Sequence, residues 1–291
     1  MKVLLIGGAG YIGSYAAFYL QEAGMDVVIL DRKSYRGPVN YCYGDITDIN
    51  AVLAAGHDAD CIVILAGVVG DPACAADPLK ASHVNNTAVK SICEVFSHRH
   101  IIFFSSCSVY GAQDGLLSED SRVDPISVYA KTKLAAEAHV MAVGGTIFRL
   151  ASVYGVGFSD TMRMDSIVNF LVKTAIYEGR ITILGGQQWK SLISVKDVRG
   201  FLQEAIQREI RGLFNISNKN YTVRRIGREI VECIPDTKII FKPALPNDRN
   251  YRVDNCKRES EFYYIPEHSL IKEIYELADF FKRQLKEQNY V

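Results

Sequence analysis

The sequence has no excess of charge of either sign and no segment long enough to cross a membrane. Its 291 residues carry 33 basic and 33 acidic side chains, so the formal net charge is zero. A protein whose main partner is nucleic acid or a membrane surface usually carries a basic excess, and both partners are therefore disfavoured. No uninterrupted apolar run reaches the roughly 20 residues that span a bilayer, and no secretory leader is recognised. We expect a soluble protein.

The sequence also lacks paired cysteine motifs, internal repeats and low-complexity tracts. Its seven cysteines are odd in number, and no two have the C-x-x-C spacing of a metal or redox site. Scattered free thiols are typical of a reducing compartment, so we expect a cytoplasmic protein without a metal centre. The length is sufficient for one or two globular domains.

The first half of the chain alternates short apolar runs with helical patterns. The runs are apolar on both faces, as expected for parallel strands buried under two layers of helices. This alternation predicts an α/β fold with a doubly wound parallel sheet of the Rossmann type. The predicted strands are Val3–Ile6, Asp26–Leu30, Val39–Tyr43, Cys61–Leu65, Ile101–Ser105 and Thr146–Leu150, and the predicted helices are Ile12–Glu22, Ile49–Ala55, Leu79–Ser97 and Val128–Val143.

The alternation loosens after Leu150, and three prolines interrupt the chain between residues 235 and 246. We therefore predict a small substrate-binding lobe that is interleaved with the Rossmann domain. The Rossmann domain is predicted to comprise residues 1–150 and 191–216, and the lobe residues 151–190 and 217–291. The elements predicted here are helices at Met164–Glu178, Val195–Gln207, Val223–Cys233 and Ser269–Lys286, and strands at Ile181–Leu184 and Leu213–Ile216.

A glycine-rich turn joins the first predicted strand to the first predicted helix. Gly7, Gly10 and Gly13 form the pattern G-x-x-G-x-x-G. Glycine permits the tight turn, the approach of the backbone to a pyrophosphate and close packing of the helix. The helix N-terminus then offers free N–H groups and a positive dipole end to the phosphates. This context predicts a dinucleotide-binding site.

The second predicted strand leads directly to Asp31. An acidic side chain at this place accepts hydrogen bonds from the adenosine ribose hydroxyls and would repel a 2′-phosphate. We therefore predict NAD rather than NADP as the cofactor, although the adjacent Arg32 and Lys33 could serve a 2′-phosphate.

Three side chains are candidates for catalysis. Tyr129 and Lys133 are one helical turn apart and therefore face the same way. Ser106 follows an apolar strand, where ligands bind in sheets of this kind. A tyrosine phenol ordinarily titrates at about 10, and a neighbouring ammonium together with a nicotinamide cation would lower that pKa. Tyr129 would then act as the base, with Ser106 orienting a substrate hydroxyl.

Together these motifs resemble the extended short-chain dehydrogenase/reductases, in particular the nucleotide-sugar epimerases and dehydratases. The resemblance covers nearly the whole chain. It implies that Asp45 and Ile46 contact the adenine, that Leu65, Ala66 and Gly67 line the cofactor, and that Asn85 supports the active-site end. The predicted cofactor-binding set is Gly7, Gly10, Tyr11, Ile12, Gly13, Asp31, Asp45, Ile46, Leu65, Ala66, Gly67, Asn85, Tyr129 and Lys133.

The resemblance also implies contacts with a nucleotide-diphosphate sugar. Asn169 and Lys190 match positions that bind the diphosphate, with lysine where the family usually has arginine, and Arg249 is a further phosphate candidate. The predicted substrate-binding set is Ser106, Ser108, Tyr129, Asn169, Lys190 and Arg249.

Besides Lys190, four residues depart from patterns within the family. Ser152 replaces an asparagine and Ser194 a histidine that are common in galactose epimerases, which leaves the sugar open. Cys107 and Ser108 stand where family dehydratases have acidic residues, so the general acid for eliminating water is missing there. Related reductase-epimerases have a catalytic cysteine at the place of Ser108. We expect Cys107 to be packed and inert.

The hypothesis is an NAD-dependent nucleotide-sugar 4-epimerase that oxidises C4 transiently and returns the hydride. An alternative is a C4 dehydrogenase or ketoreductase with tightly bound cofactor. A third reading is a catalytically silent NAD-binding regulatory protein, which usually lacks the tyrosine or the lysine. The resemblance further implies a homodimer through the helices at Leu79–Ser97 and Val128–Val143.

Overall fold

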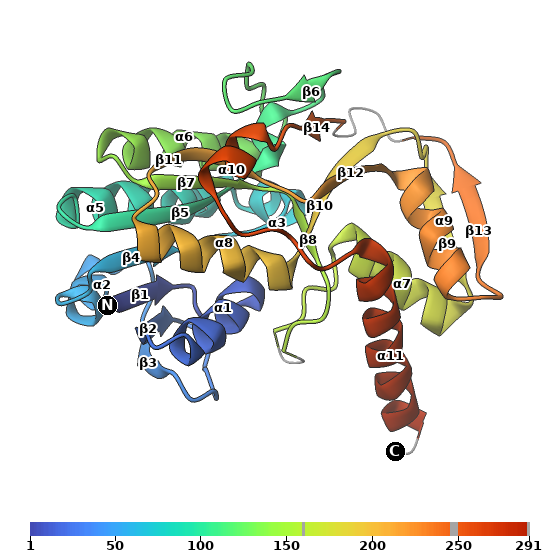
Figure 1. The fold of residues 1–291 in the computed structure, drawn as a ribbon, viewed down its shortest axis with the longest axis horizontal. Coiled ribbons are helices and arrows are strands. Elements are labelled where there is room, and N and C mark those ends of the chain that lie inside the picture. The colour runs from blue at the N-terminus through green and yellow to red at the C-terminus, as the bar shows by residue number, and fades with distance from the viewer. Residues whose placement is uncertain (159–160, 245–249, 290–291) are drawn as a thin grey trace.

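The computed structural model describes residues 1–158, 161–244 and 250–289. Its main sheet has seven strands, which are β1 (Lys2–Ile6), β2 (Asp26–Asp31), β3 (Asn40–Tyr43), β4 (Cys61–Ile64), β5 (His100–Ser106), β7 (Thr146–Leu150) and β11 (Gly212–Ile216). All of them run parallel, in the order β11-β7-β5-β4-β1-β2-β3 (Figure 1). The strand order reverses between β1 and β4, and the carboxyl ends of strands at such a switch point form the ligand crevice.

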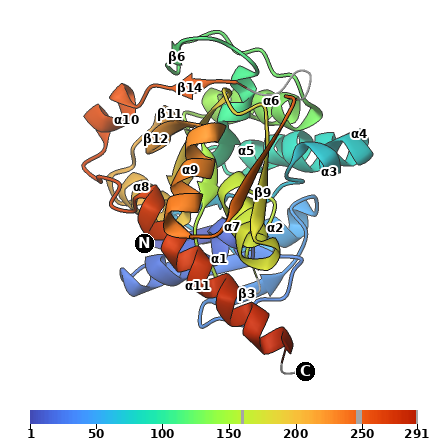
Figure 2. The same cartoon turned by 90° about the vertical axis from the view of Figure 1, so that its right-hand side faces the viewer.

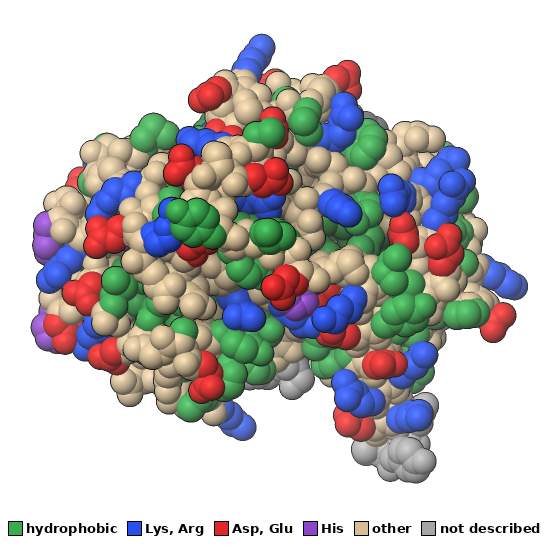
Figure 3. All heavy atoms as spheres, viewed as in Figure 1, with side chains coloured by type: hydrophobic (Ala, Val, Ile, Leu, Met, Phe, Trp, Pro, Cys, Tyr) green, Lys and Arg blue, Asp and Glu red, His purple; other side chains and the backbone are tan. Residues whose placement is uncertain are grey.

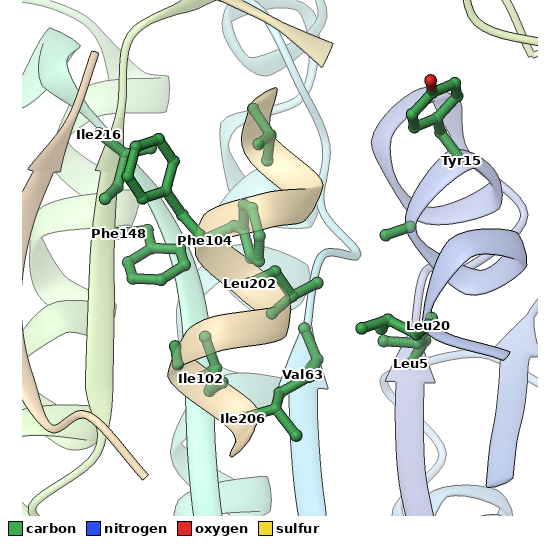
Figure 4. Packing of buried hydrophobic residues seen from close by; sticks show 14 of the residues in the cluster. Leu5, Tyr15, Leu20, Val63, Ile102, Phe104, Phe148, Leu202, Ile206 and Ile216 are labelled. Atoms are coloured by element: carbon green, nitrogen blue, oxygen red, sulfur yellow. The ribbon is translucent and has the colours of Figure 1, made fainter. Parts of the chain in front are cut away.

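Helices cover both faces of this sheet, which confirms the predicted doubly wound architecture. Those on one face are α1 (Tyr11–Glu22) and α8 (Val195–Arg208), and those on the other are α2 (Ile49–Gly56), α5 (Ala88–Val95) and α6 (Val128–Ala142). Side chains alternate along the strands between the two layers. Leu5 packs with α1 and α8, whereas Leu4 packs with α2 and α5. Figure 4 shows the first layer, where α1, α8 and the strands meet.

The predicted helix over residues 79–97 has a more complex course. It consists of α4 (Pro78–Ser82), a π-helical turn (His83–Thr87) and then α5, and a short α3 (Asp71–Ala76) precedes it. A π turn inserts an extra residue into the helix, and such turns occur frequently at functional sites. Asn85 lies in this turn. Hydrophobic periodicity does not reveal such an insertion.

The lobe is built from small sheets and helices, which Figure 2 shows from the lobe side. The strands are β8 (Ser152–Tyr154), β9 (Arg180–Leu184), β10 (Trp189–Ser194), β12 (Lys219–Thr222) and β13 (Lys238–Lys242), and the main helices are α7 (Ile167–Glu178), α9 (Val223–Cys233) and α11 (Leu270–Asn289). These helices pack around their own apolar core, which contains Tyr154 and Ile274.

Strands β8, β10 and β12 form one sheet of the lobe, and β9 pairs with β13 in another. Two very short strands, β6 (Leu116–Leu117) and β14 (Arg252–Val253), form a further pair. The sequence predicted β9 but none of the other strands, because two- to six-residue runs with mixed polarity have no clear period.

The chain crosses between the two parts near its C-terminus. Helix α10 (Cys256–Glu261) packs against β11, and Phe262 inserts into the core of the main sheet with its ring 5.2 Å from that of Phe214. Asp197 on α8 accepts hydrogen bonds from Tyr264 Oη at 2.8 Å and from the Glu267 backbone N–H at 3.0 Å. These contacts connect the segment before α11 to the main sheet, and the domain boundaries proposed from the sequence stay a prediction.

The surface agrees with the neutral composition. Acidic and basic side chains are interspersed on the face shown in Figure 3. None of the helices in the described part of the chain is both long and apolar enough to span a bilayer. In the same residues there is no group of three or more His, Cys, Asp or Glu side chains placed to hold a metal ion.

Truncation of Phe201 tests the layer under α8. Its ring is completely buried and lies edge to face with Phe262 and Tyr264, so Phe201→Ala should lower the free energy of unfolding by about 3–5 kcal/mol. Urea denaturation measures this change. The matched control is Leu79→Ala at a side chain that is 84% exposed, which should change the free energy by less than about 0.5 kcal/mol. Equal effects of the two substitutions would contradict the packing described here.

Candidate active site

A continuous cleft of about 1070 Å³ runs from the carboxyl ends of the central strands to the lobe. It brings together residues that are up to 245 positions apart in the sequence, from Ile6 to Tyr251. The residues predicted for cofactor or substrate that line it are Gly7, Gly10, Tyr11, Ile12, Gly13, Asp31, Asp45, Ile46, Leu65, Ala66, Gly67, Ser106, Tyr129, Lys133 and Lys190.

The glycine turn forms one wall of the cleft. Gly7 has φ +89°, and a Cβ there would lie 2.4 Å from the Ala66 backbone nitrogen, so the turn requires glycine. At Gly10, a Cβ would meet, among the described residues, the Gly7 carbonyl oxygen at 3.4 Å and would otherwise project into open space. Helix α1 begins at Tyr11 without a side-chain cap. The free N–H groups of its first turn and the bare backbone at Gly10 fit a dinucleotide pyrophosphate.

Asp31 is held beside this turn at the end of β2. Its Oδ2 accepts a hydrogen bond from the Ala9 backbone N–H at 2.9 Å, and its Oδ1 accepts one from the Lys33 N–H at 2.9 Å. The Arg32 guanidinium lies 3.7 Å from the Asp45 carboxylate, and the negative charge of the carboxylate offsets the positive charge of the guanidinium. Burial alone would raise the pKa of Asp45, but hydrogen bonds from the Thr47 backbone and hydroxyl lower it. Two carboxylates therefore line the end of the cleft at which the sequence predicts the adenosine.

Helix α6 supplies Tyr129 and Lys133. Ser127 caps the helix by accepting a hydrogen bond from the Ala130 N–H at 3.2 Å, which fixes where the helix begins. Lys133 is 2% exposed, and its Nζ donates to the Phe104 carbonyl oxygen at 2.8 Å. The same ammonium lies 4.6 Å from the centre of the Phe103 ring. Burial lowers the pKa of Lys133 to about 8, against the opposite effects of Cys74 and Glu137.

Ser106 stands at the end of β5, on the cleft wall. Its Oγ lies 2.6 Å from the Ser108 Oγ and accepts a hydrogen bond from the Ser108 N–H at 3.2 Å. Ser108 itself is buried behind Ser106, so a direct contact with substrate stays a prediction. Cys107 is fully buried, donates to the Arg149 carbonyl oxygen at 3.0 Å and has its pKa raised by burial. It is packed, as expected.

The two predicted asparagines are buried and bind backbone groups. Asn85 accepts from the Val68 N–H at 2.8 Å and donates to the Val68 carbonyl at 3.0 Å, which fixes the loop after β4. Asn169 accepts from the Gly155 N–H at 3.0 Å and donates to the Arg163 carbonyl at 2.8 Å. Neither side chain is on the cleft wall, and the diphosphate contact of Asn169 stays a prediction.

The cleft also contains residues that the site prediction omitted, including Val69, Arg163, Asp165, Phe170 and Tyr251. Arg163 Nε donates to Asp165 Oδ1 at 2.7 Å, and this bond outweighs burial, so that the pKa of Arg163 is raised. Long-range folding rather than a local motif brings them to the cleft. Of the predicted phosphate contacts, Lys190 lies on the wall, whereas Arg249 is outside the described residues.

The fold and the site together define a dinucleotide-binding protein of the short-chain dehydrogenase/reductase type. The defining features are the doubly wound sheet, the glycine turn and the carboxylate at the end of β2, with Ser106, Tyr129 and Lys133 in the same cleft. More narrowly, the chain belongs to the NAD dependent epimerase/dehydratase family, whose model matches residues 3–217. Membership of this family confirms the predicted cofactor, NAD.

Curated relatives and solved structures agree with this family. The chain is 31% identical to a UDP-glucose 4-epimerase of Lactobacillus helveticus over 64% of this chain and 63% of that protein, so the match spans less than two thirds of the relative's length. It is 24% identical to the UDP-glucose 4-epimerase of Corynebacterium glutamicum over 100% of this chain and 98% of that protein. The structure of MoeE5 in complex with UDP-glucose and NAD is similar with a TM-score of 0.86, at 25% identity, over 98% of this chain and 100% of that chain.

Asp31 should decide between the two nicotinamide cofactors. Asp31→Ala should weaken NAD binding by about 10- to 100-fold, because hydrogen bonds to a charged group contribute about 1.5–3 kcal/mol. Binding of NADP, already weak, should change little or improve. Calorimetric titration with each cofactor measures the difference between the affinities for NAD and NADP. The control is Asp58→Ala, at an exposed carboxylate outside the cleft. Tighter binding of NADP than of NAD by the unaltered protein would refute the role given to Asp31.

Proposed function

We propose that this protein is an NAD-dependent nucleotide-sugar 4-epimerase. The observation that carries the proposal is the position of Ser106, Tyr129 and Lys133 in the same cleft as the glycine turn, which continues to Lys190 on the lobe. These residues supply a hydroxyl, a phenol and a buried ammonium, which are the groups that reversible oxidation of an alcohol requires. The names of the curated relatives support a nucleotide sugar as the source of that alcohol.

Each of these cleft residues has a separate role in the proposed reaction. The glycine turn and Asp31 would hold NAD, which supplies the acceptor and later the donor of a hydride when it is bound. Ser106 would accept or donate a hydrogen bond at the sugar C4 hydroxyl. Tyr129 would remove the proton of that hydroxyl and return it after the sugar has turned over. The positive charge of Lys133 would favour the phenolate form of Tyr129.

A C4 dehydrogenase or ketoreductase is the second candidate. It is favoured by Ser152, which lines the cleft where galactose epimerases commonly have asparagine. A reshaped pocket could hold the keto-sugar in one orientation and release it instead of turning it over. Ser194, the other departure, is buried and caps α8 by accepting a hydrogen bond from the Lys196 N–H at 3.2 Å, so it bears less on the sugar.

Incubation of the NAD-loaded protein with UDP-glucose separates these candidates. An epimerase should produce the C4 epimer with no lasting change of absorbance at the reduced-nicotinamide band, because each hydride that is removed is returned. A dehydrogenase should give a lasting, stoichiometric rise of that band and a 4-keto product. If UDP-glucose is not converted, a thermal-shift panel of other nucleotide sugars identifies the base and sugar, because a bound ligand raises the melting temperature.

Removal of the Tyr129 hydroxyl should abolish most turnover. Tyr129→Phe takes away the proton acceptor and leaves the ring, so kcat should fall by about 10²- to 10⁴-fold while NAD and the sugar nucleotide still bind. Cys107→Ala is the comparison, since its thiol is buried away from the cleft and its loss should be mild. A near wild-type rate in Tyr129→Phe would refute the role of Tyr129 as the base. An inactive Cys107→Ala enzyme that still folds would show that the Cys107 thiol takes part in catalysis.

We further propose that Lys190 and Arg249 bind the diphosphate of the substrate, that the protein is a homodimer and that it is cytoplasmic. Lys190 supports the first point because it lies on the cleft wall at the lobe. Substitution of Lys190 by methionine should raise KM for the nucleotide sugar much more than it lowers kcat. Analytical ultracentrifugation tests the dimer.

A further inference from the structure

A buried carboxylate lies one helical turn behind the catalytic lysine. Glu137 is 3% exposed and is not on the cleft wall, yet it continues the row of Tyr129 and Lys133 along α6. Its Oε2 accepts from Arg149 NH2 at 2.8 Å, and Arg149 Nε lies 3.1 Å from Oε1 and 3.2 Å from Oε2. The Ser105 hydroxyl donates to its Oε1 at 2.5 Å. The mechanism gives this group no task.

These bonds join α6 and β5, which carry the catalytic residues, to the neighbouring strand β7. Ser105 precedes Ser106 on β5, and Arg149 lies on the neighbouring strand β7, where Ser105 is its partner in the register. The carboxylate on α6 therefore fixes the helix against both strands at the level of Ser106. A shift of α6 by one residue would break four hydrogen bonds inside the protein, where an unpaired charge is very unfavourable.

A second layer of hydrogen bonds holds Arg149 in place. Its NH1 donates to Tyr110 Oη at 3.0 Å and to the Glu119 carbonyl at 3.2 Å. Tyr110 Oη in turn donates to Asn215 Oδ1 on β11 at 2.8 Å. Burial alone would lower the pKa of Arg149, but its bonds to Glu137 raise it, so this side chain stays a cation. The ion pair is therefore held from two sides, by Ser105 on β5 and, through Tyr110, by Asn215 on β11.

Glu137 is also a source of negative charge near Lys133. Two groups raise the pKa of that lysine against the effect of burial, Cys74 on α3 and Glu137 on α6. Burial raises the pKa of the Cys74 thiol, so Cys74 is neutral at pH 7. The Glu137 carboxylate, which is ion-paired with the Arg149 guanidinium, is therefore the negatively charged group of the two. The β5 side of Lys133 offers the Phe104 carbonyl and the Phe103 ring, which are uncharged.

We propose that Glu137 is the positioning residue of this active site, holding Tyr129 and Lys133 in register with Ser106 and placing its carboxylate one helical turn behind the Lys133 ammonium. Its catalytic consequence rests on the proposed function, because it acts through the base Tyr129. Its effect on Lys133 does not, and it can be measured without turnover.

The test is a pH titration of Lys133 by NMR in protein labelled with ε-¹³C-lysine, with Lys133→Arg assigning the resonance by removing it. The midpoint should lie at about 8 in the unaltered protein. Glu137→Gln keeps the size of the side chain and removes its charge, so the midpoint should fall by roughly one pH unit. Turnover should then fall about fivefold more at pH 8 than at pH 6, because the charged fraction of Lys133 at pH 8 drops from roughly one half to one tenth.

Two further variants separate charge from packing. Glu137→Asp keeps the charge and shortens the side chain, so it should lower the melting temperature and leave the midpoint near 8. The double variant Glu137→Gln/Arg149→Met removes both charges and leaves no unpaired ion, which favours folding if Glu137→Gln alone is too unstable. Its midpoint should also fall, but by less than in the single variant, because the Arg149 cation that opposes the Lys133 ammonium is removed together with the carboxylate.

An unchanged Lys133 midpoint in both charge-removing variants, with only the melting temperature lowered, would overturn the proposal and leave Glu137 a structural residue. An equal fall in Glu137→Asp would overturn it as well, because the charge would not be the cause. If no nucleotide sugar is converted, the proposed function is refuted, and the titration still decides the role of Glu137.

Discussion

The Lys133 ammonium is buried beneath the cofactor cleft, and much of the surrounding structure serves to accommodate its charge. A buried cation needs hydrogen bonds and negative potential in place of the water it has lost. The Phe104 carbonyl, the Phe103 ring and the Glu137 carboxylate provide them. In turn, Glu137 is held by Ser105 on β5 and by Arg149 on the neighbouring strand β7. The carboxylate next to Lys133 is therefore also the group that aligns α6 with Ser106. The same hydrogen bonds therefore hold the active-site residues in place and pack α6 against the central sheet.

The Rossmann half could be predicted from the sequence because its signals are local. Strands that are buried on both faces have short apolar runs in the sequence. The glycine pattern and Asp31, at the end of the next strand, mark the cofactor site within the first 31 residues of the chain. Tyr129 and Lys133 share a helix face, so their spacing alone places them together. The structure places all of these residues in one cleft.

The lobe and the buried network could not be predicted in this way, because they depend on contacts between distant segments. Strands such as β8 and β12 have three and four residues and obtain their partners from the fold. The π turn that holds Asn85 leaves no trace in the hydrophobic period. Glu137 looks like any surface glutamate in a helix until β7 brings Arg149 to it. The substrate contact of Asn169 rests on resemblance alone and stays a prediction; the hydrogen bonds of its amide to the backbone of Gly155 and Arg163 could not be foreseen from the sequence.

The central claim is that one hydride leaves C4 of a sugar and returns to the same carbon without leaving the cleft. UDP-glucose carrying deuterium at C4 tests it directly, with both epimers analysed by mass spectrometry and NMR after equilibration. Our mechanism predicts that the deuterium stays at C4 in the starting sugar and in its epimer, with none lost to water. Loss of the label to solvent, or its accumulation in released reduced cofactor, would contradict that mechanism.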